Sequence, residues 1–193
     1  MKHMTLKTIF NPFEKFDEKI LLAIGIIFFI ITIPLSYFTE SCFISIYRIA
    51  PFKTIHLYDL IIPTFISFAA MIAVLFLLGK VFYRKTRLID IANAVLISQI
   101  PLIILIPLEK FDFIKQSIET VTNYQSHPTE IFPFVDFLVM ILFTIANIGC
   151  LIYSVAIFYN GFKTATNIKK WQQTVIFCIV TFLTVILCQI LNN

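Results

Sequence analysis

The side chains of this chain that could act as catalytic bases do not form a known motif. Its three histidines, His3, His56 and His127, all lie outside the long apolar runs of the sequence. No H-E-x-x-H, G-x-S-x-G or paired-glutamate pattern occurs. An enzyme working inside the apolar runs would therefore lack a buried histidine base. We predict that the protein is not an enzyme and has no catalytic residues.

The four cysteines indicate neither a metal site nor a disulfide framework. Cys150, Cys178 and Cys188 lie within apolar runs, where cysteine behaves as a small hydrophobic side chain. Cys42 is then the one cysteine left for a loop, and no Cys–His spacing typical of a metal site is present. We expect no metal-binding residues, no cofactor-binding residues and no cofactor.

Three amide side chains inside the apolar runs are the remaining candidates for function. They are Asn93, Gln99 and Asn147. A polar path through them would be expected of a transport component for small solutes or lipids. The alternative is packing between helices, which favours small and weakly polar residues on one helix face. We favour packing, because no charged residue lies at mid-depth in any run.

Five long apolar runs must position these residues. Of all residues, 59% are hydrophobic and 13% are charged, against about 25% charged in a soluble domain. Each run has 18 to 26 residues without Lys, Arg, Asp or Glu, and a helix of about 20 residues crosses the hydrocarbon core. The runs are Ile20–Thr39, Leu60–Gly79, Ile91–Leu108, Phe137–Phe162 and Trp171–Asn193. Their continuous hydrophobicity argues against a membrane β-barrel, whose strands alternate.

The predicted fold is an all-α integral membrane bundle of five transmembrane helices. The expected spans are about 20–39, 60–79, 90–108, 134–160 and 171–191. These helices fill most of the length, so we expect residues 1–193 to form a single membrane domain without an appended soluble domain.

Positive charge predicts the side of the membrane on which each end of the chain lies, because cytoplasmic segments are rich in lysine and arginine. The segments on the N-terminal side hold eleven such residues: Lys2, Lys7, Lys15, Lys19, Lys80, Arg84, Lys85, Arg87, Lys163, Lys169 and Lys170. Those on the other side hold four: Arg48, Lys53, Lys110 and Lys115. We therefore predict an inside N-terminus and, with an odd number of spans, an outside C-terminus.

The segment before the first span predicts a short helix on the membrane surface. Asn11 and Pro12 fit the first positions of a helix. Phe13 and Phe16 follow at helical spacing, interleaved with lysines. We expect an interfacial helix at about 12–18.

The loops between spans carry further local signals. The short loop GKVFYRKTRLID predicts an antiparallel hairpin of spans two and three, with Thr86 capping the third span and Asp90 in its first turn. The spacing of Phe111, Ile114 and Ile118 predicts an amphipathic helix on the outer surface. The first outer loop, SCFISIYRIAPFKTIHLYD, is apolar enough to dip into the interface or pack across the helix ends.

Two loops on the predicted inner side carry the candidate contact residues. The basic cluster in YRKTR could bind an anionic lipid, and polar residues in FYNGFKTATNIKK could contact a lipid headgroup or a partner. The candidates are Arg84, Lys85, Arg87, Asn160, Lys163, Asn167, Lys169 and Lys170. Topology signalling and helix capping are the alternative roles, and we expect Asn160-Gly161 to end the fourth span through a left-handed cap.

The order of these parts resembles the Yip-domain family, five-span membrane proteins named for members that interact with Ypt/Rab GTPases. The resemblance is carried by NPFEKF, by LLGKVFYRKTRLIDIANAVLISQIP and by FYNGFKTATNIKK, and it covers nearly the whole chain. It implies a five-helix fold, an inward N-terminus and a non-enzymatic membrane role. The compact pattern is similar to bacterial members, which implies a multi-pass location in a bacterial inner membrane.

The leading hypothesis is a non-catalytic integral membrane protein that scaffolds partners or organises lipid. Expected partners are the lipid bilayer and other membrane proteins or further copies of the chain. Nucleic acid is not expected, because the net charge of +4 is distributed for topology and forms no basic binding patch. The alternative hypothesis is the transport component with the path through Asn93, Gln99 and Asn147.

Overall fold

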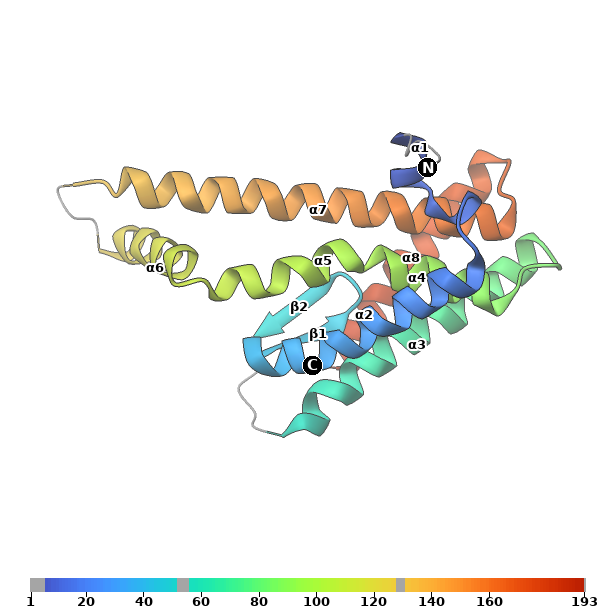
Figure 1. The fold of residues 1–193 in the computed structure, drawn as a ribbon, viewed down its shortest axis with the longest axis horizontal. Coiled ribbons are helices and arrows are strands. Elements are labelled where there is room, and N and C mark those ends of the chain that lie inside the picture. Colours follow the sequence, from blue (N-terminus) through green and yellow to red (C-terminus); the bar gives the residue numbers. More distant parts are fainter. Residues whose placement is uncertain (1–5, 52–55, 128–130, 193) are drawn as a thin grey trace.

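Long helices running roughly side by side form most of the molecule in the computed structural model (Figure 1). The structure describes residues 6–51, 56–127 and 131–192. Within these ranges, five helices are long and apolar enough to cross a membrane: Glu18–Thr39, Leu57–Phe82, Leu88–Leu108, Phe134–Thr166 and Trp171–Leu191. The five-helix membrane bundle predicted from the sequence is confirmed.

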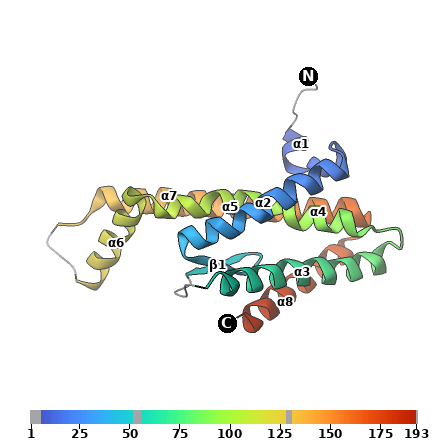
Figure 2. The same cartoon turned by 60° about the horizontal axis from the view of Figure 1, so that its bottom comes forward.

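The described elements follow one another with short connections. In chain order they are α1 (Leu6–Phe10), α2 (Glu18–Thr39), β1 (Ser41–Ser45), β2 (Arg48–Pro51), α3 (Leu57–Phe82), α4 (Leu88–Ser98), α5 (Ile100–Leu105), α6 (Asp112–Ser126), α7 (Phe134–Thr166) and α8 (Trp171–Leu191). Two 3-10 turns, Pro12–Glu14 and Ile106–Lys110, precede α2 and α6. The amphipathic helix expected in the third loop is α6, which leaves the bundle at a steep angle to α7 (Figure 2).

The third span is the central helix of the bundle. Two thirds of its apolar window (67%) is buried inside the protein, against at most 33% for the other spans. It consists of α4 and α5, which meet at Gln99, and of the start of the 3-10 turn Ile106–Lys110. Pro101 explains the break, because a proline removes one backbone donor and clashes with the carbonyl four residues earlier. α3 and α4 form the predicted antiparallel hairpin.

The loop between the first two spans forms a β-hairpin that the all-α prediction missed. β1 and β2 pair antiparallel and lie among the helices (Figure 1). Every residue of β1 is buried, and Cys42, which we expected in a loop, has no exposed surface. Backbone inside a membrane bundle must have its hydrogen bonds satisfied, and a hairpin pairs the backbone groups that face the partner strand. Lys53, counted above for topology, lies outside the described residues.

Two helix boundaries differ from the sequence-based expectation. In place of one helix at 12–18, the chain forms the 3-10 turn Pro12–Glu14, and α2 begins at Glu18. α7 does not end at Asn160-Gly161 but continues to Thr166, where Asn167 adopts the left-handed conformation with a φ of 51°. Tertiary contacts explain this continuation, since α4 packs along this part of α7.

Aromatic rings fill much of the core between the hairpin and the helices. Phe162 of α7 and Phe177 of α8 stack with ring centroids 4.5 Å apart. Phe158 lies 5.4 Å from Phe177 and 6.0 Å from Tyr47, which sits in the turn of the hairpin. These contacts bind α7 and α8 to the hairpin.

The bundle has two chemically different ends. We call one the basic end; it comprises the start of α2, the α3–α4 loop at 83–87 and the α7–α8 loop at 167–170. We call the other the hairpin end; it comprises β1, β2 and the end of α8. Asn192 donates a hydrogen bond to the carbonyl of Ile44 at 2.9 Å, so the end of α8 lies at the hairpin end.

Candidate functional site

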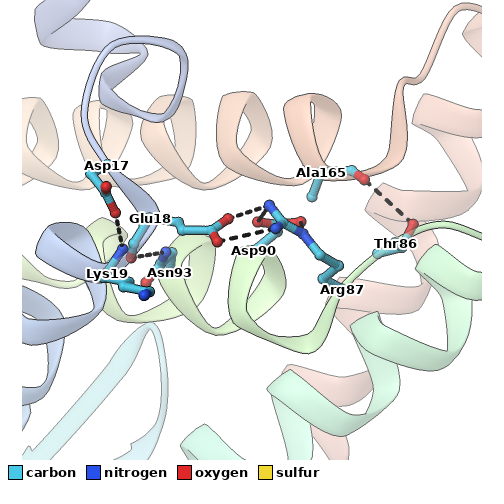
Figure 3. A network of polar contacts seen from close by, with 8 residues as sticks. All are labelled: Asp17, Glu18, Lys19, Thr86, Arg87, Asp90, Asn93 and Ala165. Carbon is cyan, nitrogen blue, oxygen red and sulfur yellow. Dashed lines mark hydrogen bonds and ion pairs between the residues drawn. The ribbon is translucent and has the colours of Figure 1, made fainter.

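The two loops that carry the predicted contact residues meet at the basic end. The hydroxyl of Thr86, in the α3–α4 loop, is 3.4 Å from the carbonyl of Ala165 near the end of α7 (Figure 3). The same hydroxyl is 2.7 Å from the carbonyl of Tyr83 and 3.1 Å from that of Gly79, so it satisfies the end of α3. The prediction that Thr86 caps α4 is wrong: the N-cap position belongs to Arg87.

Arg87 joins the start of α2 to the start of α4 (Figure 3). Its guanidinium donates to Asp90 Oδ2 at 3.1 Å and to Glu18 Oε1 at 3.0 Å. Hydrogen bonds and charge from Asp90, with a smaller contribution from Glu18, raise the pKa of Arg87. The Arg87 side chain is 59% exposed, so water and salt weaken these ion pairs and their main effect is to orient the three side chains.

Asn93 lies directly beneath this network. It is 2% exposed, and its Nδ2 donates to the backbone carbonyl of Glu18 at 2.9 Å. Its Oδ1 has no hydrogen-bond partner among the described residues. Asp17 caps α2 by accepting from the backbone N–H of Lys19 at 2.8 Å. The first turn of α2 is thus held both by its own cap and by α4.

A pocket of about 230 Å³ opens between α2, α4 and α7 at this network. Charged and amide side chains line it, together with two phenylalanines from the segment before α2. The lining residues are Phe13, Phe16, Glu18, Leu21, Arg87, Asp90, Asn93, Gly161, Thr164 and Ala165. Such a pocket can bind a small polar group through hydrogen bonds and charge.

Gly161 allows the close packing that builds this pocket. A Cβ atom at this position would lie 2.7 Å from Ala94 Cβ and 2.7 Å from the ring of Phe13. Real Cβ atoms do not approach other atoms so closely, so a larger residue would push α7 away from α4 or displace the phenylalanine. The glycine predicted to end a helix therefore serves as a contact point between helices.

The N-terminal segment is fixed to α7 next to the pocket. Asn160 Nδ2 donates to the carbonyl of Phe10 at 2.9 Å, and the Tyr153 hydroxyl donates to the carbonyl of Ile9 at 3.0 Å. The rings of Phe10 and Tyr153 pack edge to face with centroids 5.5 Å apart. Asn160 is thus engaged in holding the protein's own chain.

The predicted contact residues fall into two groups. Three have internal roles: Arg87 in the ion network, Asn160 on the N-terminal segment and Asn167 at the end of α7. The other five are exposed cations that make no ion pair within the described part of the chain: Arg84, Lys85, Lys163, Lys169 and Lys170. We call these five the rim cations.

Sequence reasoning missed Glu18 as a member of the site. Asp90 was expected beside the basic cluster, whereas Glu18 lies 69 positions earlier than its partner Arg87. Its sequence signal is its place directly after the capping Asp17.

The three amides of the proposed transport path lie in separate local contacts. Asn93 holds the start of α2, and Asn147 donates to the carbonyl of Phe143 within its own helix at 3.0 Å. Gln99 has no exposed surface, and its Nε2 is 3.2 Å from the Ser98 hydroxyl at the α4–α5 break. No hydrogen bond joins any two of these amides within the described residues. No cluster of three or more His, Cys, Asp or Glu that could hold a metal occurs there either.

Comparison with known proteins identifies the family. The family model of the Yip1 domain matches residues 6–191. The chain belongs to the Yip1-domain family. The match includes α1 through α8, so the basic end and the hairpin end are both parts of the Yip1 domain. No curated protein and no solved structure matches the chain.

Proposed function

We propose that this Yip1-domain protein is a non-catalytic membrane scaffold that gathers lipids or partner proteins at its basic end. The observation that carries the proposal is the grouping of the five rim cations around one end of the bundle. They come from the α3–α4 loop, from the last turns of α7 and from the α7–α8 loop. The Thr86–Ala165 contact holds these segments next to one another.

The rim cations are suited to anionic surfaces because they remain exposed. Each Lys or Arg beside an anionic membrane surface contributes about 1 kcal/mol of attraction. Among the residues that the structure describes, no carboxylate forms an ion pair with them, and Glu18 and Asp90 are engaged by Arg87. The rigid attachment of α2, α4 and α7 keeps the cations in a fixed arrangement, which lowers the entropic cost of binding.

We further propose that the basic end faces the cytoplasm of a bacterial cell and that the protein lies in the inner membrane. The excess of lysine and arginine on this side supports the orientation. The resemblance of the compact sequence pattern to bacterial members supports the location.

Crosslinking in native membranes tests the scaffold proposal. We compare the wild type with a variant that carries glutamine at Arg84, Lys85, Lys169 and Lys170, and identify the co-purified lipids and proteins. The control variant carries glutamine at Arg48, Lys110 and Lys115, near the opposite end. Protease accessibility of an N-terminal tag verifies that orientation is unchanged in both.

We expect the basic-end variant to lose most of its specific crosslinks and the control to keep them. Equal recovery of the same molecules from the two variants would overturn the proposal. An N-terminal tag that is accessible from outside in the wild type would overturn the orientation.

A further inference from the structure

A second hollow lies on another face of the bundle, between α2, α3 and α4. Its volume is about 330 Å³, and the residues that line it are apolar. Phe68 and Leu96 are only 3% and 9% exposed, whereas Phe65 and Leu88 at its edge are 59% and 54% exposed. The hollow is therefore a groove with a buried floor and an edge open to the surrounding lipid. We call it the α4 groove.

The lining residues of the α4 groove on α4 span somewhat less than the thickness of one lipid leaflet. Along α4 its lining extends from Leu88 to Leu96. Eight helical steps of 1.5 Å correspond to about 12 Å, and half of the hydrocarbon core is about 15 Å thick. Leu88 directly follows the basic α3–α4 loop. The α4 groove thus reaches from Leu88, beside the basic end, to the middle of α3, where Phe65, Ala69 and Ala73 line it.

The α3 wall of the groove leads to a lysine. Phe65, Ala69 and Ala73 line the groove. Phe76 and Lys80 follow at helical spacing, and at 100° per residue all five lie within an arc of about 80°. The alanines leave open the space that leucine side chains would occupy. Lys80 is exposed at the basic end of this same face.

Lys80 lies on the same face of α3, between the lining residues of the groove and the basic end. Its Nζ lies 5.3 Å from the centre of the Phe76 ring and donates to the carbonyl of Arg84 at 3.2 Å. No carboxylate forms an ion pair with Lys80 in the described part of the chain. Arg84 and Lys85 are exposed in the adjoining loop.

We propose that the α4 groove binds one anionic phospholipid, with an acyl chain along α4 and its phosphate beside Lys80. This rests on the proposed membrane-organising function and names a lipid class for it. The groove fits an acyl chain by its shape. It does not attract the chain by the hydrophobic effect, because bulk lipid is as apolar as the groove. The charge at its mouth then selects the anionic headgroup.

Native mass spectrometry of lipid retained after detergent extraction tests the proposal. The protein is first reconstituted in vesicles of equal phosphatidylglycerol and phosphatidylcholine. We expect the wild type to retain one phosphatidylglycerol. A variant with Ala69→Leu and Ala73→Leu fills the groove at exposed positions and should retain several-fold less. Ala146→Leu, at an exposed alanine of α7, is the matched control and should retain the wild-type amount.

A second variant separates the contribution of the lipid headgroup from that of the acyl chain. Lys80→Gln should reduce the preference for phosphatidylglycerol over phosphatidylcholine several-fold while leaving total retained lipid nearly unchanged. Retention of wild-type phosphatidylglycerol by the double-leucine variant would overturn the proposal. Competition by soluble glycerophosphate would also overturn it, because that result places the phosphate at a site that needs no acyl chain.

The two proposals fail in different ways. The groove variants keep all five rim cations, so their crosslinked partners should match those of the wild type. A variant that loses crosslinked partners but keeps its retained lipid is impaired at the rim cations. A variant that loses retained lipid but keeps its partners is impaired at the α4 groove.

Discussion

Polar groups at the two ends of the bundle are satisfied by different chemistry. At the basic end, the polar network contains charges, with the exposed Arg87 between the half-buried Glu18 and Asp90. At the hairpin end, the exposed Arg48 donates to Gln189 Oε1 at 3.0 Å, whereas the buried contacts are made by neutral hydroxyls and amides. The Ser67 hydroxyl donates to the carbonyl of Ile44 at 2.8 Å, and Asn192 donates to the same carbonyl at 2.9 Å.

The hairpin end needs these donors because of a β-bulge. The pairing of β1 and β2 skips Ile44, which lies between Phe43 and Ser45 and has no partner residue on β2. Ile44 is 5% exposed, and an unsatisfied carbonyl there would be costly. Neutral donors satisfy it at a lower desolvation cost than charged ones. The comparison indicates that the hairpin end is closed and structural, whereas the basic end is accessible and suited to binding.

The largest expected difference between the ends is in thiol accessibility. Maleimide should modify an engineered Lys85→Cys about a hundredfold faster than Cys42, because a local opening that costs about 2.7 kcal/mol exposes a buried group in about one molecule in a hundred. Peptide-level mass spectrometry of protein labelled in membranes measures both rates. Comparable rates at the two positions would show that the hairpin end is open.

The pH dependence of this labelling follows from burial. Burial raises the pKa of the Cys42 thiol above its ordinary value of 9.0. Raising the pH to 9 should therefore accelerate labelling at Lys85→Cys and leave Cys42 protected. Above pH 9 the unfolded thiol ionises before the folded one, so this group lowers the stability of the folded state as the pH rises.

Removing both donors to the Ile44 carbonyl should give the next largest effect. We expect Ser67→Ala combined with Asn192→Leu to lower the free energy of unfolding by about 1–3 kcal/mol, because a buried acceptor loses its side-chain partners. Denaturant unfolding in detergent, followed by circular dichroism, measures the change. Thr144→Ala, which removes an exposed hydroxyl bonded within its own helix, should change little. Equal losses in both variants would contradict the closed hairpin end.

The smallest effect is expected for Arg87→Gln at the basic end. The variant should lose a little stability at low salt and none in about 1 M salt, where the screening length is about 3 Å. The midpoint of denaturant unfolding at the two salt concentrations measures this, with Lys170→Gln as an unpaired control. If the loss of stability is as large at high salt as at low salt, the ion pairs of Arg87 are shielded from solvent, contrary to this prediction.

Several features could be predicted because they depend on local composition. The five spans, the α3–α4 hairpin and helix α6 follow from run length, loop length and apolar spacing. The grouping of Arg84, Lys85, Lys169 and Lys170 at one end follows from the alternation of spans. Predicting these properties requires no knowledge of which helices contact one another.

The members of the site depended on contacts between distant residues. Glu18 reaches Arg87 only because α2 packs on α4, and nothing in either segment marks the pair. Asn160 followed by glycine reads as a helix end, but packing against α4 and the N-terminal segment keeps the helix intact through Thr166. Such packing contacts override the local tendency of the helix to end, because they contribute more free energy than a helix cap does.

The amino-acid sequence by itself determined that the chain crosses the membrane five times and that its cations gather on one side, since hydrophobic length and charge act residue by residue. The tertiary structure decided that SCFISIYRIAP becomes a hairpin with a buried first strand, that Gly161 and Asn93 line a polar pocket, and that two alanines of α3 leave an open groove. Their common physical reason is that burial and the spaces between helices are properties of several segments together.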